Sequence, residues 1–550
     1  MKILNRKNLN IMRSLKLLKA GAIGLMLIVG LASCEGSLTS YNENPNAPKD
    51  APAKLILPNT ITSSMNRQYS MSGLNGYVGG IWVQQYAKIQ YVDEGRYDLS
   101  GRIGMVDGFW EDFYSETLSD LKRIKDQASA GTGNPDKDAN TIAIANVLMA
   151  WNLHMMTDLW GPIPATEALK GAEDEAVISP AYDSQQSVYN TIIQLLDEAT
   201  STMVPSNTPF GSEDLIYNGD MTKWQKLANS LKLRAYMRLS DVDESTASSG
   251  IQQVFNNGNY FTSNADNAKL SYQADPYNNP VNNFFQTRED HKISSKMITE
   301  LKNLDDPRLH FYAMPIEADS AWQYLENDHP DGRYPDSVYV SVINGDENNS
   351  LPLNEASNIG HYFMAPKSPG FVMTYSEVEF ILAEAALRGW IETPVDAASH
   401  YNAGIRASME MYNQSKMDAA LDGFAGDQAF TKQSVHTEEY PAGMTESEIT
   451  SYLTGPGAFP AAGTMQERMD AIALQKWIGM YGQGLQSWYE WRRLDYPTLT
   501  PGPTAVLNEV PKRVFFPFAE QSVNGQNYND AVGMLDGPDN MTTKVWWDVN

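Results

Sequence analysis

The chain has 550 residues, 42% of them hydrophobic and 10% aromatic, with a single cysteine, a composition that excludes a wholly disordered or collagen-like protein and predicts a globular one. The 41 basic and 67 acidic side chains give a net charge of −26, and no basic stripe lies outside the first 33 residues. Because nucleic-acid binding needs clustered Lys and Arg to neutralise phosphates, the charge pattern argues against that class.

Residues 1–33 have the features of a bacterial lipoprotein signal peptide. They carry six basic and no acidic side chains, and the apolar run that starts at Ala20 is too short to span a bilayer. Leu31, Ala32 and Ser33 precede the only cysteine, so we expect cleavage before Cys34 and a diacylglyceryl and N-acyl lipid on it. The alternative is cleavage elsewhere, with Cys34 an incidental thiol. Met12 is an alternative start.

Residues 34–54 are rich in Asn, Pro and Ser and predict a tether between the lipid and a single folded body over 55–550. Without a second cysteine the chain has no intramolecular disulfide and no Cys-based zinc site. The body must therefore be stabilised by its core, and the lipid would hold it on a membrane surface.

The strongest periodic patterns in the body are helical, with apolar residues three and four positions apart. We expect Thr222 to be an N-cap, Pro394 to lie in a first helical turn, and Gly389 to end a helix. The sequence predicts a mostly α fold of tetratricopeptide-like helical pairs, although no strict 34-residue repeat is visible. The expected helices cover 139–157, 185–203, 222–240, 375–388, 394–412 and 465–481.

Two long irregular segments near 257–298 and 303–373 are candidate ligand-binding loops. The first mixes aromatic rings with Asn, and sugars need flat rings for their CH faces and amides for their hydroxyls. The alternative is that the rings cover loop-to-helix contacts and the Asn side chains support turns. The candidates are Tyr272, Tyr277, Asn278, Asn279, Phe284, Phe285, Arg288, Trp322 and Tyr324. We expect that removing Tyr272, Tyr277, Phe284 and Phe285 together weakens ligand capture without unfolding the body.

A second aromatic group, Tyr77, Trp82, Tyr86 and Tyr91, has the spacing of one helix face, which favours a place in the core. On the helices we also interpret Trp224, Arg234, Arg238, Glu384, Trp488 and Arg493 as packing and ion-pairing residues.

No pattern of catalytic residues stands out, and we expect no catalytic residue, no metal site and no cofactor besides the lipid. The chain has no His-Glu-x-x-His, Gly-x-Ser-x-Gly or phosphate-loop motif, and its seven histidines form no ligand-spaced pair. Residues 344–350 offer oxygen ligands for calcium but lack the EF-hand spacing, so a solvated turn is the favoured interpretation.

Several segments in the same order resemble the SusD/RagB family of outer-membrane nutrient-binding lipoproteins, and specifically its SusD-like branch. The sequence Asp158-Leu-Trp-Gly-Pro162 and the helix containing Arg234 and Arg238 are among them. The matching segments are 31–34, 42–46, 158–168, 224–240, 306–309, 376–389, 475–477 and 488–493.

This resemblance implies an α superhelical body with few short strands that sits on a SusC-like TonB-dependent β-barrel transporter at the outer membrane. It implies capture of an oligosaccharide or a peptide, a cell-surface location with anchoring through the lipid on Cys34, and no chemistry. A surface-anchored glycan or peptide hydrolase and a helical-repeat scaffold are the two alternatives.

Overall fold

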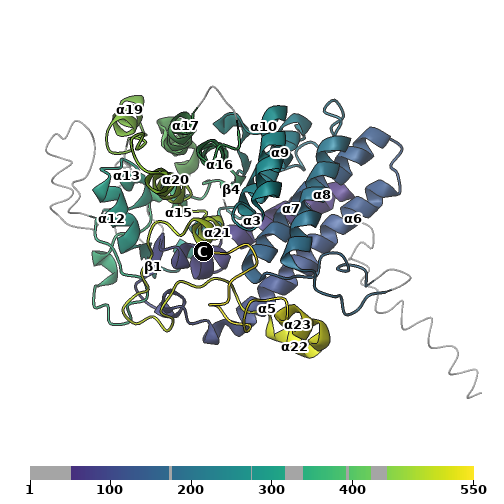
Figure 1. Cartoon of the computed structure of the whole chain (residues 1–550), viewed down its shortest axis with the longest axis horizontal. Helices are drawn as coiled ribbons and strands as arrows, with labels where there is room; N and C mark the ends of the chain where they lie inside the picture. The colour runs from purple at the N-terminus through teal and green to yellow at the C-terminus, as the bar shows by residue number, and fades with distance from the viewer. Residues whose placement is uncertain (1–50, 172–175, 274, 316–338, 392–395, 423–441) are drawn as a thin grey trace, which may run out of the picture. The chain divides into compact units, whose positions relative to one another are not determined.

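The structure is a computed structural model of the whole chain, shown in Figure 1. It describes residues 51–171, 176–273, 275–315, 339–391, 396–422 and 442–550. Contacts divide the chain into two units, Met1–Pro52 and Ala53–Asn550, and every element below belongs to the second. The predicted signal peptide, Cys34 and most of the tether lie outside the described residues.

The first half of this unit is a series of helices in which each long helix packs on the next, as Figure 1 shows. Contacts join α6 to α7, α7 to α8, α8 to α9, and α9 to α10. The prediction of a mostly α fold built from helical pairs is therefore confirmed. The helices are α3 (Ala53–Tyr69), α6 (Ser119–Ser129), α7 (Pro135–Trp160), α8 (Gln185–Thr202), α9 (Met221–Arg238) and α10 (Glu244–Asn257).

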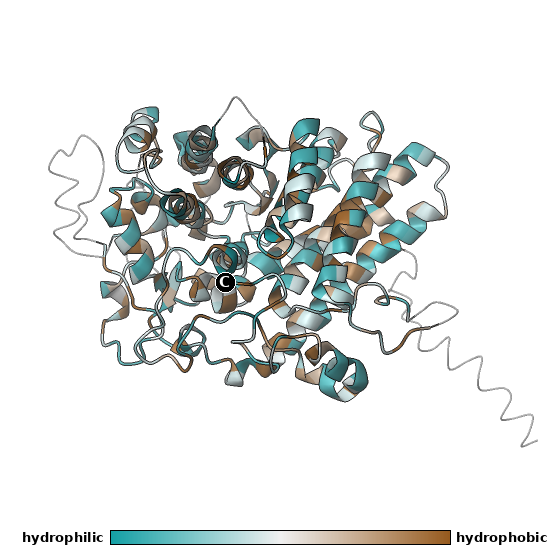
Figure 2. Ribbon diagram, in the orientation of Figure 1, coloured by the Kyte–Doolittle hydropathy of each residue, from teal (hydrophilic) through white to brown (hydrophobic). Residues whose placement is uncertain are grey.

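The second half repeats this arrangement with shorter helices. Here α16 packs on α17 and α20, α20 packs on α21, and α16 also contacts α9, which joins the two series. Figure 2 shows hydrophobic residues concentrated along α7, which is buried over most of its length. The helices are α16 (Tyr375–Leu387), α17 (Ala397–Met409), α19 (Glu446–Thr454), α20 (Met465–Gly479) and α21 (Gly484–Leu494).

Local capping explains where these helices begin and end. The N-cap prediction for Thr222 is wrong: the Asp220 carboxylate lies two residues earlier and accepts the backbone N–H groups of both Thr222 and Lys223. Gly389 has a φ of 76° and follows the last turn of α16, as predicted for a helix stop. The N-cap of α17 is Asp396, and Pro394 lies outside the described residues.

Two small antiparallel sheets complete the fold and confirm the expectation of few short strands. The first pairs β1 (Tyr86–Lys88) with β3 (His291–Ile293), and the second pairs β2 (Ala268–Leu270) with β4 (Gly370–Met373). Each pairing joins segments that are far apart in the sequence: the first connects the segment after α4 to the one near 257–298, and the second connects the two segments that the sequence predicts as irregular.

Short helices occupy much of the remaining chain. Some fall in the segments near 257–298 and 303–373 that the sequence predicts as irregular, and the others lie between α3 and α6, after α17 and near the C-terminal end. They are η1 (Asn75–Gly79), α4 (Gly80–Trp82), η2 (Val92–Arg96), η3 (Ser100–Arg102), α5 (Ile103–Asp112), η4 (Phe113–Leu118), η5 (Asn264–Asp266), α11 (Pro280–Phe285), α12 (Ser295–Asn303), α13 (Leu309–Tyr312), η7 (Leu353–Glu355), α15 (His361–Met364), η8 (Glu410–Tyr412), α18 (Gln414–Leu421), α22 (Phe518–Val523) and α23 (Gly525–Val532).

Buried ion pairs join neighbouring helices, as predicted for their Arg and Glu residues: one pair connects α9 to α16 across the two helical series, and another connects α21 to α16 within the second series. Arg234 binds Glu377 with an N–O distance of 2.7 Å, and Arg493 binds Glu384 at 2.6 Å. Trp224 and Trp488 are fully buried, which confirms their interpretation as packing residues. Within the ranges given above, no helix is long and apolar enough to cross a membrane.

Candidate ligand-binding site

The predicted ligand-binding loop near 257–298 folds into β2, α11 and β3, and this buries most of its aromatic rings. Tyr272, Phe284 and Phe285 are buried, and the Tyr272 hydroxyl donates to Asn66 Oδ1 at 2.8 Å. Rings in these positions support the loop from inside. The expectation that they can be removed without unfolding the body is therefore revised, because their truncation would open cavities.

The two asparagines of this loop are also buried, and they bind the protein itself. Asn279 is the N-cap of α11, where its Oδ1 accepts the Val281 N–H, and its Nδ2 donates to the Ser368 carbonyl. The Asn278 Nδ2 donates to Asn282 Oδ1 at 2.6 Å. Both side chains hold the loop in shape, which is the alternative that the sequence left open.

Tyr277 and Arg288 are the members of the predicted set that face solvent. The Tyr277 residue is 72% exposed and the Arg288 side chain is 44% exposed. Trp322 and Tyr324, the remaining two candidates, lie outside the described residues.

Tyr91 joins Arg288 at the surface, although the sequence favours the core for its aromatic group. Tyr77, Trp82 and Tyr86 are buried as expected, whereas Tyr91 is 64% exposed. The Arg288 guanidinium carbon lies 5.7 Å from the centre of the Tyr91 ring. We call Tyr91 and Arg288, which lie side by side, together with the exposed Tyr277 earlier in the same loop as Arg288, the candidate ligand surface.

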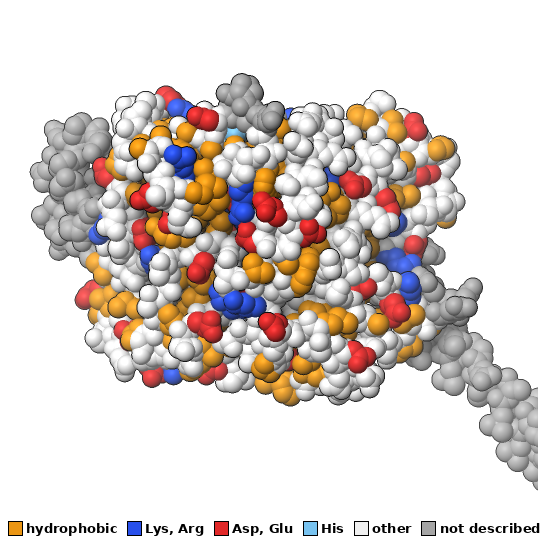
Figure 3. All heavy atoms as spheres, in the orientation of Figure 1, with side chains coloured by type: hydrophobic (Ala, Val, Ile, Leu, Met, Phe, Trp, Pro, Cys, Tyr) orange, Lys and Arg blue, Asp and Glu red, His pale blue; other side chains and the backbone are white. Residues whose placement is uncertain are grey.

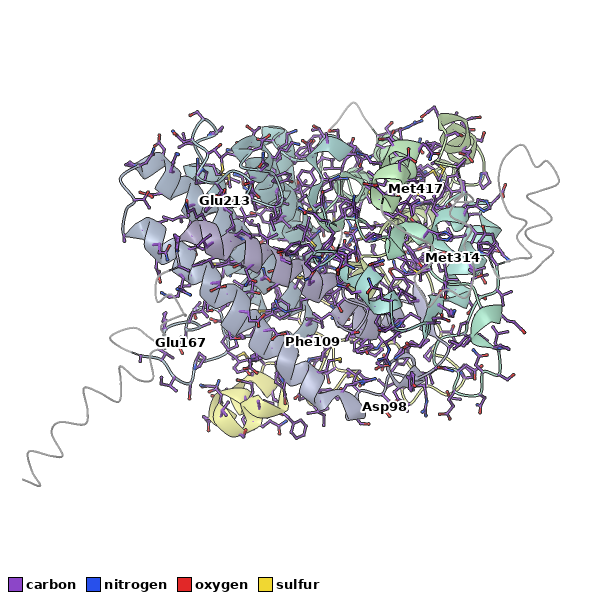
Figure 4. The ribbon with its side chains drawn as sticks, turned by 180° about the vertical axis from the view of Figure 1, so that it is seen from behind. Asp98, Phe109, Glu167, Glu213, Met314 and Met417 are labelled. Carbon is purple, nitrogen blue, oxygen red and sulfur yellow. The ribbon has the colours of Figure 1, made fainter. Side chains whose placement is uncertain are left out.

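The short sheet explains why Tyr91 and Arg288 meet. In the antiparallel register Lys88 lies opposite His291, so Tyr91, three residues after Lys88, and Arg288, three residues before His291, leave the sheet together. No sequence signal pairs these positions, because strands of three residues are too short to show an alternating pattern. In Figure 4, Asp98 marks the loop that follows Tyr91.

A series of ion pairs connects Arg288 to charged side chains buried under the surface. Arg288 Nε lies 3.2 Å from Asp290 Oδ1, and Asp290 Oδ2 lies 3.5 Å from the Lys88 ammonium group. Lys88 also binds Glu94 at 3.0 Å, and Glu94 binds Arg102 at 2.6 Å. Because Lys88 and Glu94 are fully buried, the centre of the network is shielded from solvent, and Asp290 connects it to the exposed Arg288 guanidinium.

His291 lies beneath the same surface and stays uncharged. Burial, with a contribution from the positive charge of Lys88, lowers the pKa of His291 to about 4. Its ring contacts Phe284 at a centroid distance of 4.8 Å, and its Nε2 lies 2.8 Å from the Gly76 carbonyl oxygen. At neutral pH this imidazole is a packing group and not a source of charge.

The candidate ligand surface offers groups that can bind a ligand. An exposed ring can stack on an apolar face of a ligand, and a guanidinium can donate several hydrogen bonds to its hydroxyl or carbonyl oxygens. Among the residues that the structure describes, no group of three or more His, Cys, Asp and Glu side chains could hold a metal ion. On the face drawn in Figure 3, acidic and basic side chains are interspersed and form no basic stripe.

Solved structures with the same fold cover nearly the whole chain. A chitin-binding protein is 28% identical with a TM-score of 0.73, over 90% of this chain and 100% of that one. A SusD homologue from Bacteroides fragilis NCTC 9343 is 23% identical with a TM-score of 0.72, over 90% and 99% of the two chains. A chitin-binding SusD homologue from Flavobacterium johnsoniae is 24% identical with a TM-score of 0.67, again over 90% and 99%. No curated protein matches the chain.

The family comparison agrees with these structures. Residues 45–517 match the SusD-like family described as "Starch-binding associating with outer membrane". This match extends from the predicted tether to the segment before α22, and so includes both helical series and the candidate ligand surface. The chain belongs to the SusD-like family.

Proposed function

We propose that this protein captures an oligosaccharide on the candidate ligand surface and performs no chemistry on it. The observation that carries the proposal is the exposed Tyr91 ring beside Arg288, with the guanidinium held by Asp290 over a buried charge network. A sugar ring fits this pairing, since its CH face stacks on the tyrosine while its hydroxyls accept from the guanidinium. The family description and the chitin-binding relative at 28% identity support a glycan as the ligand.

We further propose that the captured glycan is delivered to a SusC-like TonB-dependent transporter in the outer membrane. The predicted lipid on Cys34 would hold the body beside such a barrel, and a tethered receptor raises the local concentration of ligand there. Mass spectrometry of protein extracted from cell envelopes tests the anchor, and co-purification with a β-barrel partner tests the assembly. Unmodified Cys34 in the envelope protein would contradict the anchor.

The glycan proposal is tested by calorimetry with the lipid-free protein and a panel of chitin oligosaccharides, starch oligosaccharides and peptides. We expect binding of at least one oligosaccharide and its recovery unchanged after incubation. Binding of peptides alone would contradict the glycan assignment, and shortened oligosaccharides would support the hydrolase alternative instead.

Substitution of Tyr91 by Ala is expected to raise the Kd for the captured oligosaccharide by about two- to twelvefold, because one aromatic stacking contact contributes about 0.5 to 1.5 kcal/mol. Arg288→Gln should weaken binding in the same titration by removing donors from the candidate ligand surface. The matched control is Phe518→Ala, which removes an exposed ring on α22 and should leave the Kd unchanged. Wild-type affinity in both Tyr91→Ala and Arg288→Gln would place the glycan elsewhere.

A further inference from the structure

A separate cavity of about 190 Å³ lies beside the second small sheet. Its walls come from η5, β2, the segment between α15 and β4, η8 and α18. In Figure 4, Met417 marks α18 on the side of the molecule seen from behind. Tyr91 and Arg288 do not line it.

The cavity is unusual in its charge. Three lysines, Lys269, Lys367 and Lys416, line it, and of the described lining residues only Glu410 is acidic. The Glu410 carboxylate already accepts a hydrogen bond from Asn264 Nδ2 at 3.3 Å. In a chain with a net charge of −26, a local excess of positive charge is a specific feature and not the average of the surface.

Among the described residues, two of these lysines have no partner for their positive charge. Lys367 binds Asp422 at 2.5 Å, whereas the ammonium groups of Lys269 and Lys416 make no hydrogen bond or ion pair with any described residue. Burial lowers the pKa of Lys269, and the positive charges of Lys416 and Lys223 lower it further. The two ammonium groups therefore repel each other, and an anion between them would relieve that repulsion.

The rest of the wall is flat and apolar. Tyr272, Tyr362 and Phe371 line the cavity beside the lysines, and all three are buried. The amides of Asn264 and Asn267 are largely occupied, since Asn264 Nδ2 donates to the Ala407 carbonyl and Asn267 Oδ1 accepts the Tyr375 N–H. The lysines and the Ser271 hydroxyl are thus donors available to a ligand, while the aromatic side chains offer a surface for its body.

We propose that this cavity binds a monosaccharide-sized organic anion, whose carboxylate or sulfate group is held by the ammonium groups of Lys269 and Lys416. The ring of the ligand lies against the aromatic wall, which distinguishes it from a free inorganic ion. This site is independent of the candidate ligand surface, and it gives an acidic chain a place for a charged ligand. A sugar acid and a sulfated sugar share the required chemistry.

The test is calorimetry of the full chain with glucuronate, glucose 6-sulfate, glucose and inorganic sulfate as probes. We expect at least one of the two acidic sugars to bind more tightly than both glucose and inorganic sulfate, and its affinity to fall as NaCl is added. Equal binding of inorganic sulfate and the acidic sugars would overturn the part of the proposal that involves the aromatic wall. Absence of binding by both acidic sugars would overturn the whole.

Substitutions of the two lysines test whether the acidic sugars bind in this cavity. Lys269→Gln and Lys416→Gln together should weaken acidic-sugar binding roughly tenfold or more, because each removes a charged donor. Lys137→Gln, an exposed lysine in the first turn of α7, is the matched control for the change in charge and should bind as the wild type does. Tyr91→Ala should also leave this binding unchanged, so that failure here is distinguishable from failure of the oligosaccharide proposal.

Folding does not confound the experiment. Lys416 is exposed on α18, so Lys416→Gln alone should fold as the wild type does and still weaken binding measurably. Wild-type affinity in Lys416→Gln would overturn the assignment of Lys416, and wild-type affinity in the double variant would overturn the site.

Discussion

Replacing Glu384 by Ala is expected to lower the free energy of unfolding by about 3 to 5 kcal/mol, because it leaves buried positive charge without its partner. The Glu384 side chain is 1% exposed, and its two oxygens each accept from Arg493 at 2.6 Å. Burial is the largest single influence and by itself would raise the pKa of Glu384, but the charge and hydrogen bonds of Arg493 together with the charges of Arg388 and Lys476 hold the pKa below its usual value. Chemical denaturation followed by circular dichroism measures the loss.

The remaining acid cannot replace Glu384. Glu490 lies 3.0 Å from Arg493, but it also binds Lys476 at 2.6 Å and Arg238 at 3.1 Å. Removal of Glu384 therefore leaves three buried cations to share this carboxylate, although Arg238 also has Asp158 at 3.3 Å.

The control for this prediction is Glu446→Ala. Glu446 binds Arg406 at 2.7 Å with good geometry, but its side chain is 69% exposed and that of Arg406 is 36% exposed. An exposed pair contributes about 1 kcal/mol or less, since water solvates each charge when the other is removed. Equal losses of stability in Glu384→Ala and Glu446→Ala would show that burial does not set the strength of the core pair.

The helices could be predicted from sequence because their signals are local. The expected helix over 185–203 is observed as α8, Gln185–Thr202, and the one over 465–481 as α20, Met465–Gly479. Ion pairing between Arg and Glu side chains of adjoining helices could also be predicted, because it follows from residue type and from the burial of the helix face. The choice of Glu384 as the partner of Arg493 is different, because it depends on how α16 packs against the segment that contains α21, and no local pattern records that packing.

The candidate ligand surface could be predicted only in part, and for the same reason. Arg288 could be predicted because it directly follows the aromatic and Asn-rich segment. Tyr91 could not, because it belongs to an aromatic group whose helical spacing predicts a place in the core. The sequence does not show that Tyr91 comes after β1, beyond the helical turns that bury Tyr77 and Trp82. In the opposite sense, the Asn and Pro residues around Phe284 suggest an exposed loop, but Asn279 caps α11 and turns that ring inward.

Phe284→Ala is expected to lower the free energy of unfolding by about 3 to 5 kcal/mol, since it removes a large buried ring and leaves a cavity. Phe284 is 5% exposed and packs edge-on against Phe285 at a centroid distance of 5.4 Å and against His291 at 4.8 Å. The Arg288 guanidinium carbon lies 5.8 Å from its ring, so Phe284 also helps to position a residue of the candidate ligand surface. Denaturant titration measures the stability.

The matched control is Tyr277→Ala in the same loop. Tyr277 is 72% exposed, and substitutions at such surface positions usually change the free energy of unfolding by about 0.5 kcal/mol or less. The two variants therefore separate the roles that the loop combines: Phe284→Ala should lose stability, and Tyr277→Ala should keep it while weakening oligosaccharide binding. If Phe284→Ala kept wild-type stability but lost binding, the ring would contact the ligand directly and α11 would have to open to expose it.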